Sequence, residues 1–186
     1  LRVLGDLVKE GKIRYVGLSN ETPWGLSEFI KAAEMHDLPK VVSVQNAYNL
    51  LNRIYESGMS EFHHRSQVGL LAYSPLAQGY LTGKYLDGAR PPGARTTLFE
   101  RGQRYETEQA EEIIRKYVNL ANEYSMDPAL MANSFVNDQD FVTSNIIGAT
   151  TMEQLKIAVG SIDTKLDEEC LKKIEEIHYG CPNPCP

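Results

Sequence analysis

The chain has 186 residues, 42% of them hydrophobic, which suits one folded domain with a sizeable core and argues against disorder. The formal net charge is -6 and no block of basic residues occurs, so nucleic acid and anionic membranes are not expected as partners. No apolar run approaches the length of a bilayer span, so we expect no membrane segment.

The three cysteines do not resemble a disulfide framework. Cys170, Cys181 and Cys185 form an odd set in a mid-sized chain, which favours a reducing compartment and hence a cytoplasmic location. The first residue is not methionine, so an organellar targeting segment stays an alternative. Cys181, Cys185 and His178 have no second ligand cluster to complete a zinc site, and we expect residues 178–186 to form a flexible tail.

Apolar periodicity and turn residues predict strands that alternate with helices along the chain. The predicted strands are residues 13–18, 41–44, 68–73 and 145–147. The first predicted helix ends at Gly11, and the second begins after Thr22-Pro23. The third and fourth cover roughly residues 52–67 and 113–124. The fifth begins after Asp127-Pro128, the sixth begins after Thr151, and the last covers about residues 167–177.

Three helix starts carry specific capping signals. Thr22 and Asp127 each precede a proline, which suits the first turn of a helix. Thr151 and Gln154 form a capping-box pattern. The apolar stripes of the helices that follow Thr22 and Thr151 predict that Trp24 and Val159 point inward.

Residues 77–104 are rich in glycine, proline and arginine. This segment, which we call the 77–104 loop, is too long for an ordinary connection and is expected to act as a lid or binding loop.

The alternation of strands and helices indicates βαβ units with a parallel sheet. Both a doubly wound sheet and part of a (β/α)8 barrel fit the pattern. No Gly-x-Gly-x-x-Gly sequence follows any predicted strand, which weakens the doubly wound alternative. Polar residues follow all four strands, at the end where a barrel carries its active site, so the barrel is favoured.

The ends of the first three predicted strands carry residues that complement a flat heterocycle with a carboxamide. Ser19, Asn20 and Gln45 offer the donors and acceptors that pair with an amide such as that of nicotinamide. Tyr73 offers an aromatic ring for stacking. Taken singly, Asn20 also fits an ordinary turn and Tyr73 an ordinary core position.

Two further segments are candidate anion sites. The 77–104 loop and the residues before it combine small residues with cations, namely Ser74, Gln78, Gly79, Thr82, Gly83, Lys84, Arg90 and Arg95. The turn Gly148–Thr151 precedes a helix N-terminus, where unpaired backbone donors favour anions. The alternatives are a solvated loop and an ordinary helix cap.

Four segments together resemble the aldo-keto reductase family, and in particular its branch with bacterial and plant oxidoreductases and potassium-channel β-subunits. They are Gly11–Asn20 (GKIRYVGLSN), Gln45–Tyr48 (QNAY), Ala72–Tyr85 (AYSPLAQGYLTGKY) and Ile146–Leu155 (IIGATTMEQL). The resemblance implies a (β/α)8 barrel, of which residues 1–186 correspond to the C-terminal half, approximately strands five to eight.

The resemblance also implies NADPH as cofactor and a role for each matched position. Ser19, Asn20 and Gln45 would hold the nicotinamide carboxamide, and Tyr73 would stack on its ring. The pyrophosphate would lie against Ser74, Leu76, Gly79 and Lys84, with Arg95 near the phosphates or adenine. The adenosine 2′-phosphate end would be surrounded by Gly148, Thr150 and Gln154.

The family's catalytic Asp, Tyr, Lys and His come from its first four strands, which these residues do not include. We therefore expect the complete protein to reduce aldehydes or ketones with NADPH, and this chain alone to be inactive. A non-catalytic NADP(H)-binding or regulatory subunit and a non-functional partial gene product are the alternatives. The turn Thr150–Met152 has no Lys or Arg for a 2′-phosphate, so NADH stays an alternative cofactor.

A half barrel would leave the two outer strands of its sheet unpaired. The sequence therefore predicts marginal stability, or self-association through these open edges.

Overall fold

The computed structural model of the chain describes residues 1–99 and 103–186. The strands are β1 (Val16–Ser19), β2 (Val41–Ala47), β3 (Gly69–Tyr73) and β4 (Val142–Ile146). The α-helices are α1 (Arg2–Lys9), α2 (Pro23–Met35), α3 (Met59–Ser66), α4 (Arg95–Phe99), α5 (Ala110–Glu123), α6 (Pro128–Asn137), α7 (Met152–Gly160) and α8 (Glu168–Gly180). Short 3-10 turns are η1 (Ile54–Ser57), η2 (Ala77–Thr82), η3 (Leu86–Gly88) and η4 (Gln103–Tyr105).

The four strands form one sheet in the order β1-β2-β3-β4, and every neighbouring pair is parallel. Helices connect the strands, so the predicted α/β alternation with a parallel sheet is confirmed. Because all pairs are parallel, the four carboxyl ends meet at the same end of the sheet. The residues that follow the strands are therefore brought close to one another.

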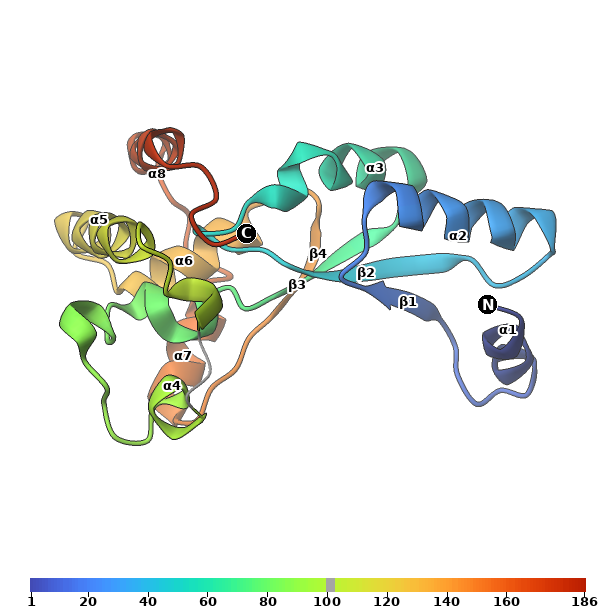
Figure 1. Cartoon of the computed structure of the whole chain (residues 1–186), viewed down its shortest axis with the longest axis horizontal. Helices are drawn as coiled ribbons and strands as arrows, with labels where there is room; N and C mark the ends of the chain where they lie inside the picture. The colour runs from blue at the N-terminus through green and yellow to red at the C-terminus, as the bar shows by residue number, and fades with distance from the viewer. Residues whose placement is uncertain (100–102) are drawn as a thin grey trace.

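The two faces of the sheet differ in cover and chemistry. Helices α2 and α3 lie over one face of the sheet (Figure 1). Side chains toward the helices are apolar and buried, as in Val16, Val44 and Leu70. On the other face the register places Ser19 beside Gln45, and both residues are exposed.

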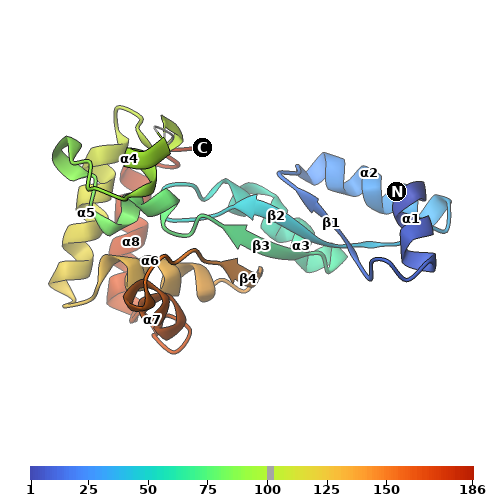
Figure 2. The same cartoon turned by 90° about the horizontal axis from the view of Figure 1, so that it is seen from below.

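Most of the remaining core lies beyond the carboxyl ends of the strands, where α5, α6 and α8 pack together (Figures 1 and 2). The ring of Tyr48 joins this core to the sheet, because it meets Phe141 edge-on at 5.2 Å and stacks on Phe135 at 6.1 Å between ring centroids. Among the described residues, no helix combines the length and the hydrophobicity needed to cross a membrane.

The predicted helix caps are present. The Thr22 side chain accepts a hydrogen bond from the Gly25 N–H, and the Asp127 carboxylate accepts from two N–H groups of the first turn of α6. These contacts satisfy backbone donors that have no partner inside the helix.

Several predicted boundaries differ from the structure, each for a local reason. The first strand begins at Val16 rather than residue 13, because the Ile13 N–H donates to the Leu7 carbonyl at the end of α1. The last strand is Val142–Ile146 rather than 145–147, because its final residue pairs with Tyr73, where β3 ends. The predicted helix over 52–67 is divided at Gly58 into η1 and α3.

The inward positions predicted for Trp24 and Val159 are wrong. Their exposed fractions are 74% and 54%. The buried residues of α2 are Leu26 and Ala33, and that of α7 is Ala158. Phe29 and Ile30 of α2 pack against the core, so most of the predicted apolar stripe faces inward and Trp24 and Val159 lie outside it.

The expected flexible tail is packed against the body of the protein. Residues 178–180 continue α8, and Cys185 is fully buried. The Arg53 N–H donates to Asn183 Oδ1 at 2.6 Å, and the Cys185 N–H donates to the Leu51 carbonyl at 3.2 Å. The three cysteines are free thiols.

Asn183→Ala should lower the free energy of unfolding by about 1–3 kcal/mol, because it leaves the partly buried Arg53 N–H without an acceptor. Urea unfolding of the two chains measures the difference. Asn122→Ala is the matched control, since Asn122 is an exposed residue of α5 and its loss should change stability by less than about 0.5 kcal/mol. Equal stability of the two variants would show that the tail contact contributes nothing.

Candidate functional site

Four predicted residues meet at the carboxyl ends of β1, β2 and β3, and we call them the strand-end site. Ser19 is the register partner of Gln45, and the Asn20 N–H donates to the Gln45 carbonyl at 2.9 Å. The Tyr73 hydroxyl donates to Asn20 Oδ1 at 2.8 Å. The structure therefore brings Ser19, Asn20, Gln45 and Tyr73 together, as parallel pairing predicts.

The side chain of Asn20 has a fixed orientation. Its Oδ1 accepts from Tyr73, and its Nδ2 donates to Ser19 Oγ at 3.3 Å. Its backbone is left-handed, with φ of 53°, a conformation that Asn adopts more readily than most residues. Asn20 is exposed, so a ligand could reach its side-chain amide, which has a second Nδ2 hydrogen to donate.

Arg104 is a member of this region that sequence reasoning missed. Its Nη1 donates to the Tyr73 hydroxyl at 3.4 Å, across 31 positions of the chain. Arg104 lies in the short η4 turn and belongs to no motif, so nothing in the sequence singles it out. Its cation lies beside the hydroxyl that orients Asn20.

The backbone after β3 turns sharply through left-handed residues. Ser74, Ala77, Gln78 and Gly79 all have positive φ, with a value of 97° at Gly79. The Leu76 carbonyl accepts from the Gly79 N–H at 2.8 Å and from the Leu81 N–H at 3.2 Å. Leu76 therefore closes this turn through its backbone.

A buried asparagine holds the start of the 77–104 loop. Asn49 is fully buried, and its Nδ2 donates to the Ser74 carbonyl at 2.9 Å and to the Tyr105 hydroxyl at 3.2 Å. Ser74 and Tyr105 stand at opposite ends of the loop, so one side chain fixes both ends. The loop differs from an irregular lid because η2, η3, α4 and η4 lie within or at the end of it.

Gly79 and Lys84 form the part of the loop best suited to an anion. A Cβ built on Gly79 would lie 3.1 Å from Lys84 Nζ, so a side chain at residue 79 would crowd the ammonium group. Lys84 Nζ also lies 5.2 Å from the centre of the Tyr85 ring. Among the described residues no carboxylate pairs with Lys84, which leaves its charge available to a phosphate.

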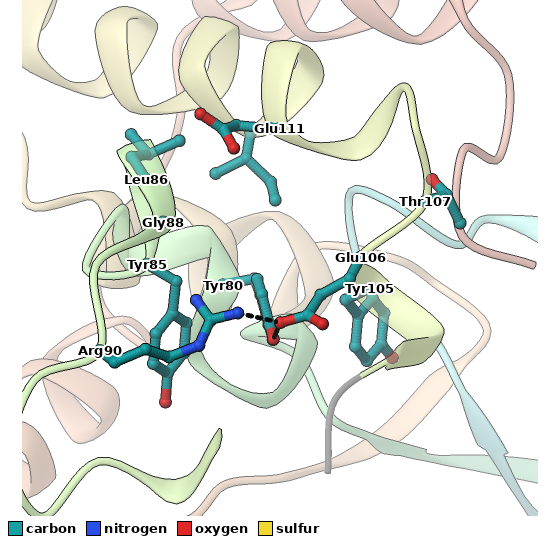
Figure 3. Close-up of a pocket in the computed structure, with 10 residues that line it drawn as sticks. Tyr80, Tyr85, Leu86, Gly88, Arg90, Tyr105, Glu106, Thr107 and Glu111 are labelled. Carbon is teal, nitrogen blue, oxygen red and sulfur yellow. Dashed lines mark hydrogen bonds and ion pairs between the residues drawn. The ribbon is translucent and has the colours of Figure 1, made fainter. Parts of the chain in front are cut away.

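The two arginines expected near the phosphates have different surroundings. Arg95 begins α4 and is exposed. Arg90 instead donates to the Glu106 carboxylate at 2.8 Å, inside a separate pocket (Figure 3). Arg90 is therefore paired with a carboxylate, whereas Arg95 is not placed in this pocket.

The turn after β4 reaches the same end of the sheet, because Ile146 pairs with Tyr73. Thr151 Oγ1 accepts from the Gln154 N–H at 3.2 Å, as the capping box predicts. The Gln154 side chain differs from that pattern, since it accepts from Thr150 N–H at 2.9 Å rather than from Thr151. Gly148, Thr150 and Gln154 are all exposed, so this helix N-terminus is open to solvent.

These groups form three polar regions at one end of the sheet. The strand-end site offers oriented donors and acceptors for a carboxamide, and Lys84 offers a cation beside a glycine turn. The N-terminus of α7 offers a further anion position. No group of three or more metal-ligating side chains occurs in the part of the chain that the structure describes.

The buried tyrosines hold their protons. Burial and the Glu106 carboxylate raise the pKa of Tyr80 to about 12, and burial raises the pKa of Tyr55 to about 12. Burial, followed by Glu56, raises the pKa of Tyr48 well above its usual range, and its hydroxyl donates to Glu56 at 2.5 Å. None of these phenols has the lowered pKa that suits a proton donor near neutral pH.

Stability should fall as the pH rises from about 10, the pKa of an unperturbed tyrosine, to about 12. The folded state raises the pKa of Tyr55 and Tyr80, so it favours their neutral form, and this advantage is complete below the unfolded pKa and disappears above the folded one. Phenolate absorbance should show a late phase, and Tyr80→Phe should make it smaller. An unchanged late phase in that variant would contradict the assignment.

Comparison with known proteins identifies relatives of this chain. Residues 1–178 match the model of the aldo/keto reductase family. The whole chain is 47% identical over 186 residues to Protein tas of Escherichia coli K12, covering 54% of that protein. It is 38% identical over 192 residues to an aldo-keto reductase of Babesia bovis, with 99% of this chain and 67% of that one covered.

A third relative is the L-glyceraldehyde 3-phosphate reductase of Escherichia coli K12, which is 33% identical over 168 residues, with 86% of this chain and 47% of that protein covered. The chain spans about half the length of most of these relatives. Its four parallel strands and connecting helices correspond to part of a (β/α)8 barrel. The chain belongs to the aldo/keto reductase family.

Proposed function

We propose that this chain supplies the cofactor-binding half of an NADPH-dependent reductase of aldehydes and ketones. The observation that carries the proposal is the orientation of the Asn20 amide by Ser19 and Tyr73 at the carboxyl ends of the strands. Family membership supports an oxidoreductase function, and the names of the reductase relatives support carbonyl reduction.

The strand-end site binds the nicotinamide in this proposal. A carboxamide has one acceptor and two hydrogens to donate, and the free Asn20 hydrogen, the Ser19 hydroxyl and the Gln45 amide complement them. The Tyr73 ring packs against the nicotinamide while its hydroxyl keeps Asn20 in place.

The other expected residues bind the rest of the cofactor. The pyrophosphate lies along Ser74, Leu76 and Gly79, where Lys84 neutralises its charge. Arg95 contacts the phosphates or the adenine. The adenosine end lies against the exposed N-terminus of α7, at Gly148, Thr150 and Gln154.

Catalysis requires more than these residues. The bound cofactor supplies a hydride, and this chain holds and orients the ring that carries it. We place the proton donor outside residues 1–186, where the family resemblance puts the catalytic Asp, Tyr, Lys and His. Tyr48, Tyr55 and Tyr80 do not replace it, because they are buried and their pKa values are raised. We therefore propose that the complete protein is an enzyme and that the chain alone is inactive.

Asn20→Ala should weaken NADPH binding by about tenfold, or ~1.4 kcal/mol, because it removes the oriented amide from the nicotinamide end. Isothermal titration with NADPH measures the change. The matched ligand is 2′-phospho-ADP-ribose, which lacks nicotinamide and should bind both proteins equally.

Lys84→Met is the matched variant. It should weaken the binding of both ligands, because both contain the pyrophosphate. An Asn20→Ala chain that loses affinity equally for the two ligands would contradict the position of the nicotinamide. Titration with NADH in parallel tests the cofactor preference, since the Thr150–Met152 turn has no cation for a 2′-phosphate.

The 186-residue chain mixed with NADPH and an aldehyde should show no loss of NADPH absorbance above the rate without protein. The reason is that the family's catalytic Asp, Tyr, Lys and His are expected from strands that residues 1–186 do not include. Sustained turnover by this chain would refute the proposed division of roles.

A further inference from the structure

A pocket lies apart from the strand-end site, between the 77–104 loop and the start of α5 (Figure 3). Its volume is about 240 Å³. This is below the roughly 300–1,000 Å³ of sites that bind drug-sized ligands, so any occupant is small. Nothing in the proposed cofactor site uses this pocket.

The charged side chains of the pocket are two carboxylates and one guanidinium, so negative charge is in excess. Arg90 Nη2 and the Tyr80 hydroxyl both donate to the same oxygen of Glu106, at 2.8 Å and 2.5 Å. The Glu106 side chain keeps 32% of its surface exposed, so a ligand can reach it. Glu111 is the second carboxylate, and it accepts from the Asp87 N–H and from Arg115 at the rim.

Aromatic rings form one side of the pocket. The ring centroids of Tyr80 and Tyr85 are 4.6 Å apart, and those of Tyr80 and Tyr105 are 6.1 Å apart. Figure 3 shows these three rings near the Arg90–Glu106 pair, with Leu86 and Glu111 across the pocket. The faces of aromatic rings attract cations, and they also pack well against apolar groups.

The aromatic side is held in place before any ligand binds. The Tyr85 hydroxyl accepts from the Thr96 N–H at 3.3 Å, and the Tyr105 hydroxyl accepts from Asn49 at 3.2 Å. All three tyrosines are at least 96% buried as whole residues, so only a small part of each ring lies open to a ligand. The part that a ligand meets is already ordered, so little affinity is lost to its ordering.

We propose that this pocket binds a small organic ammonium ion, a primary amine attached to an apolar body. The ammonium group binds the Glu106 carboxylate beside Arg90 or in its place, and the apolar body packs against the tyrosine rings, Leu86 and Ile114. The excess of carboxylates and the aromatic faces both favour a cation over an anion.

Three aromatic probes of similar size test the charge preference: phenethylamine, 3-phenylpropionate and phenylalanine. Isothermal titration of the wild-type chain without NADPH should show phenethylamine binding at least about tenfold more tightly than either of the others. The amide resonance of Gly88, which lines the pocket, should shift with phenethylamine. No binding of the amine, or tighter binding of the acid or of the amino acid, would overturn the proposal.

Glu106→Gln keeps the size of the side chain and removes its charge. This variant should weaken the binding of phenethylamine by about tenfold. Glu108→Gln is the matched control, because Glu108 is exposed and does not line the pocket. Equal affinities of the two variants would refute the role of Glu106. If Glu106→Gln does not fold, the probe series on the wild-type chain still decides the matter, and it does so independently of the cofactor proposal.

Discussion

The parallel register of the sheet is the constraint on which the proposed site depends. Ser19 lies beside Gln45, and the Asn20 N–H continues the ladder with a hydrogen bond to the Gln45 carbonyl. A shift by one residue would turn Ser19 and Gln45 to the opposite face. Burial of Val44 and Leu70 under the helices opposes such a shift. The buried apolar face of the sheet therefore determines which polar side chains lie on the exposed face.

The 77–104 loop depends on a second constraint, the fully buried side chain of Asn49. Because this amide binds Ser74 and Tyr105, it positions both the turn that carries Gly79 and the aromatic side of the pocket beside α5. Loss of either partner would leave a buried polar group unsatisfied, which costs about 1–3 kcal/mol. The same contact thus supports two separate surfaces of the loop.

Features with a local cause could be predicted from the sequence, and features with a distant partner could not. The caps at Thr22 and Asp127 need only the first turn of their own helices, and both are present. The strand ends meet because the strands are parallel. Arg104 reaches Tyr73 through tertiary folding alone, and the burial of Cys185 depends on the Leu51 region far along the chain. The sequence around Arg104 and Cys185 contains no motif that predicts either contact.

The side-chain amide resonances of Asn20 and Gln45 test the central claim most directly. If the strand-end site holds the nicotinamide, NADPH shifts both resonances, while 2′-phospho-ADP-ribose leaves them in place and shifts the backbone amide of Thr150. NADPH binding that leaves the Asn20 and Gln45 side chains unchanged would show that the nicotinamide lies elsewhere.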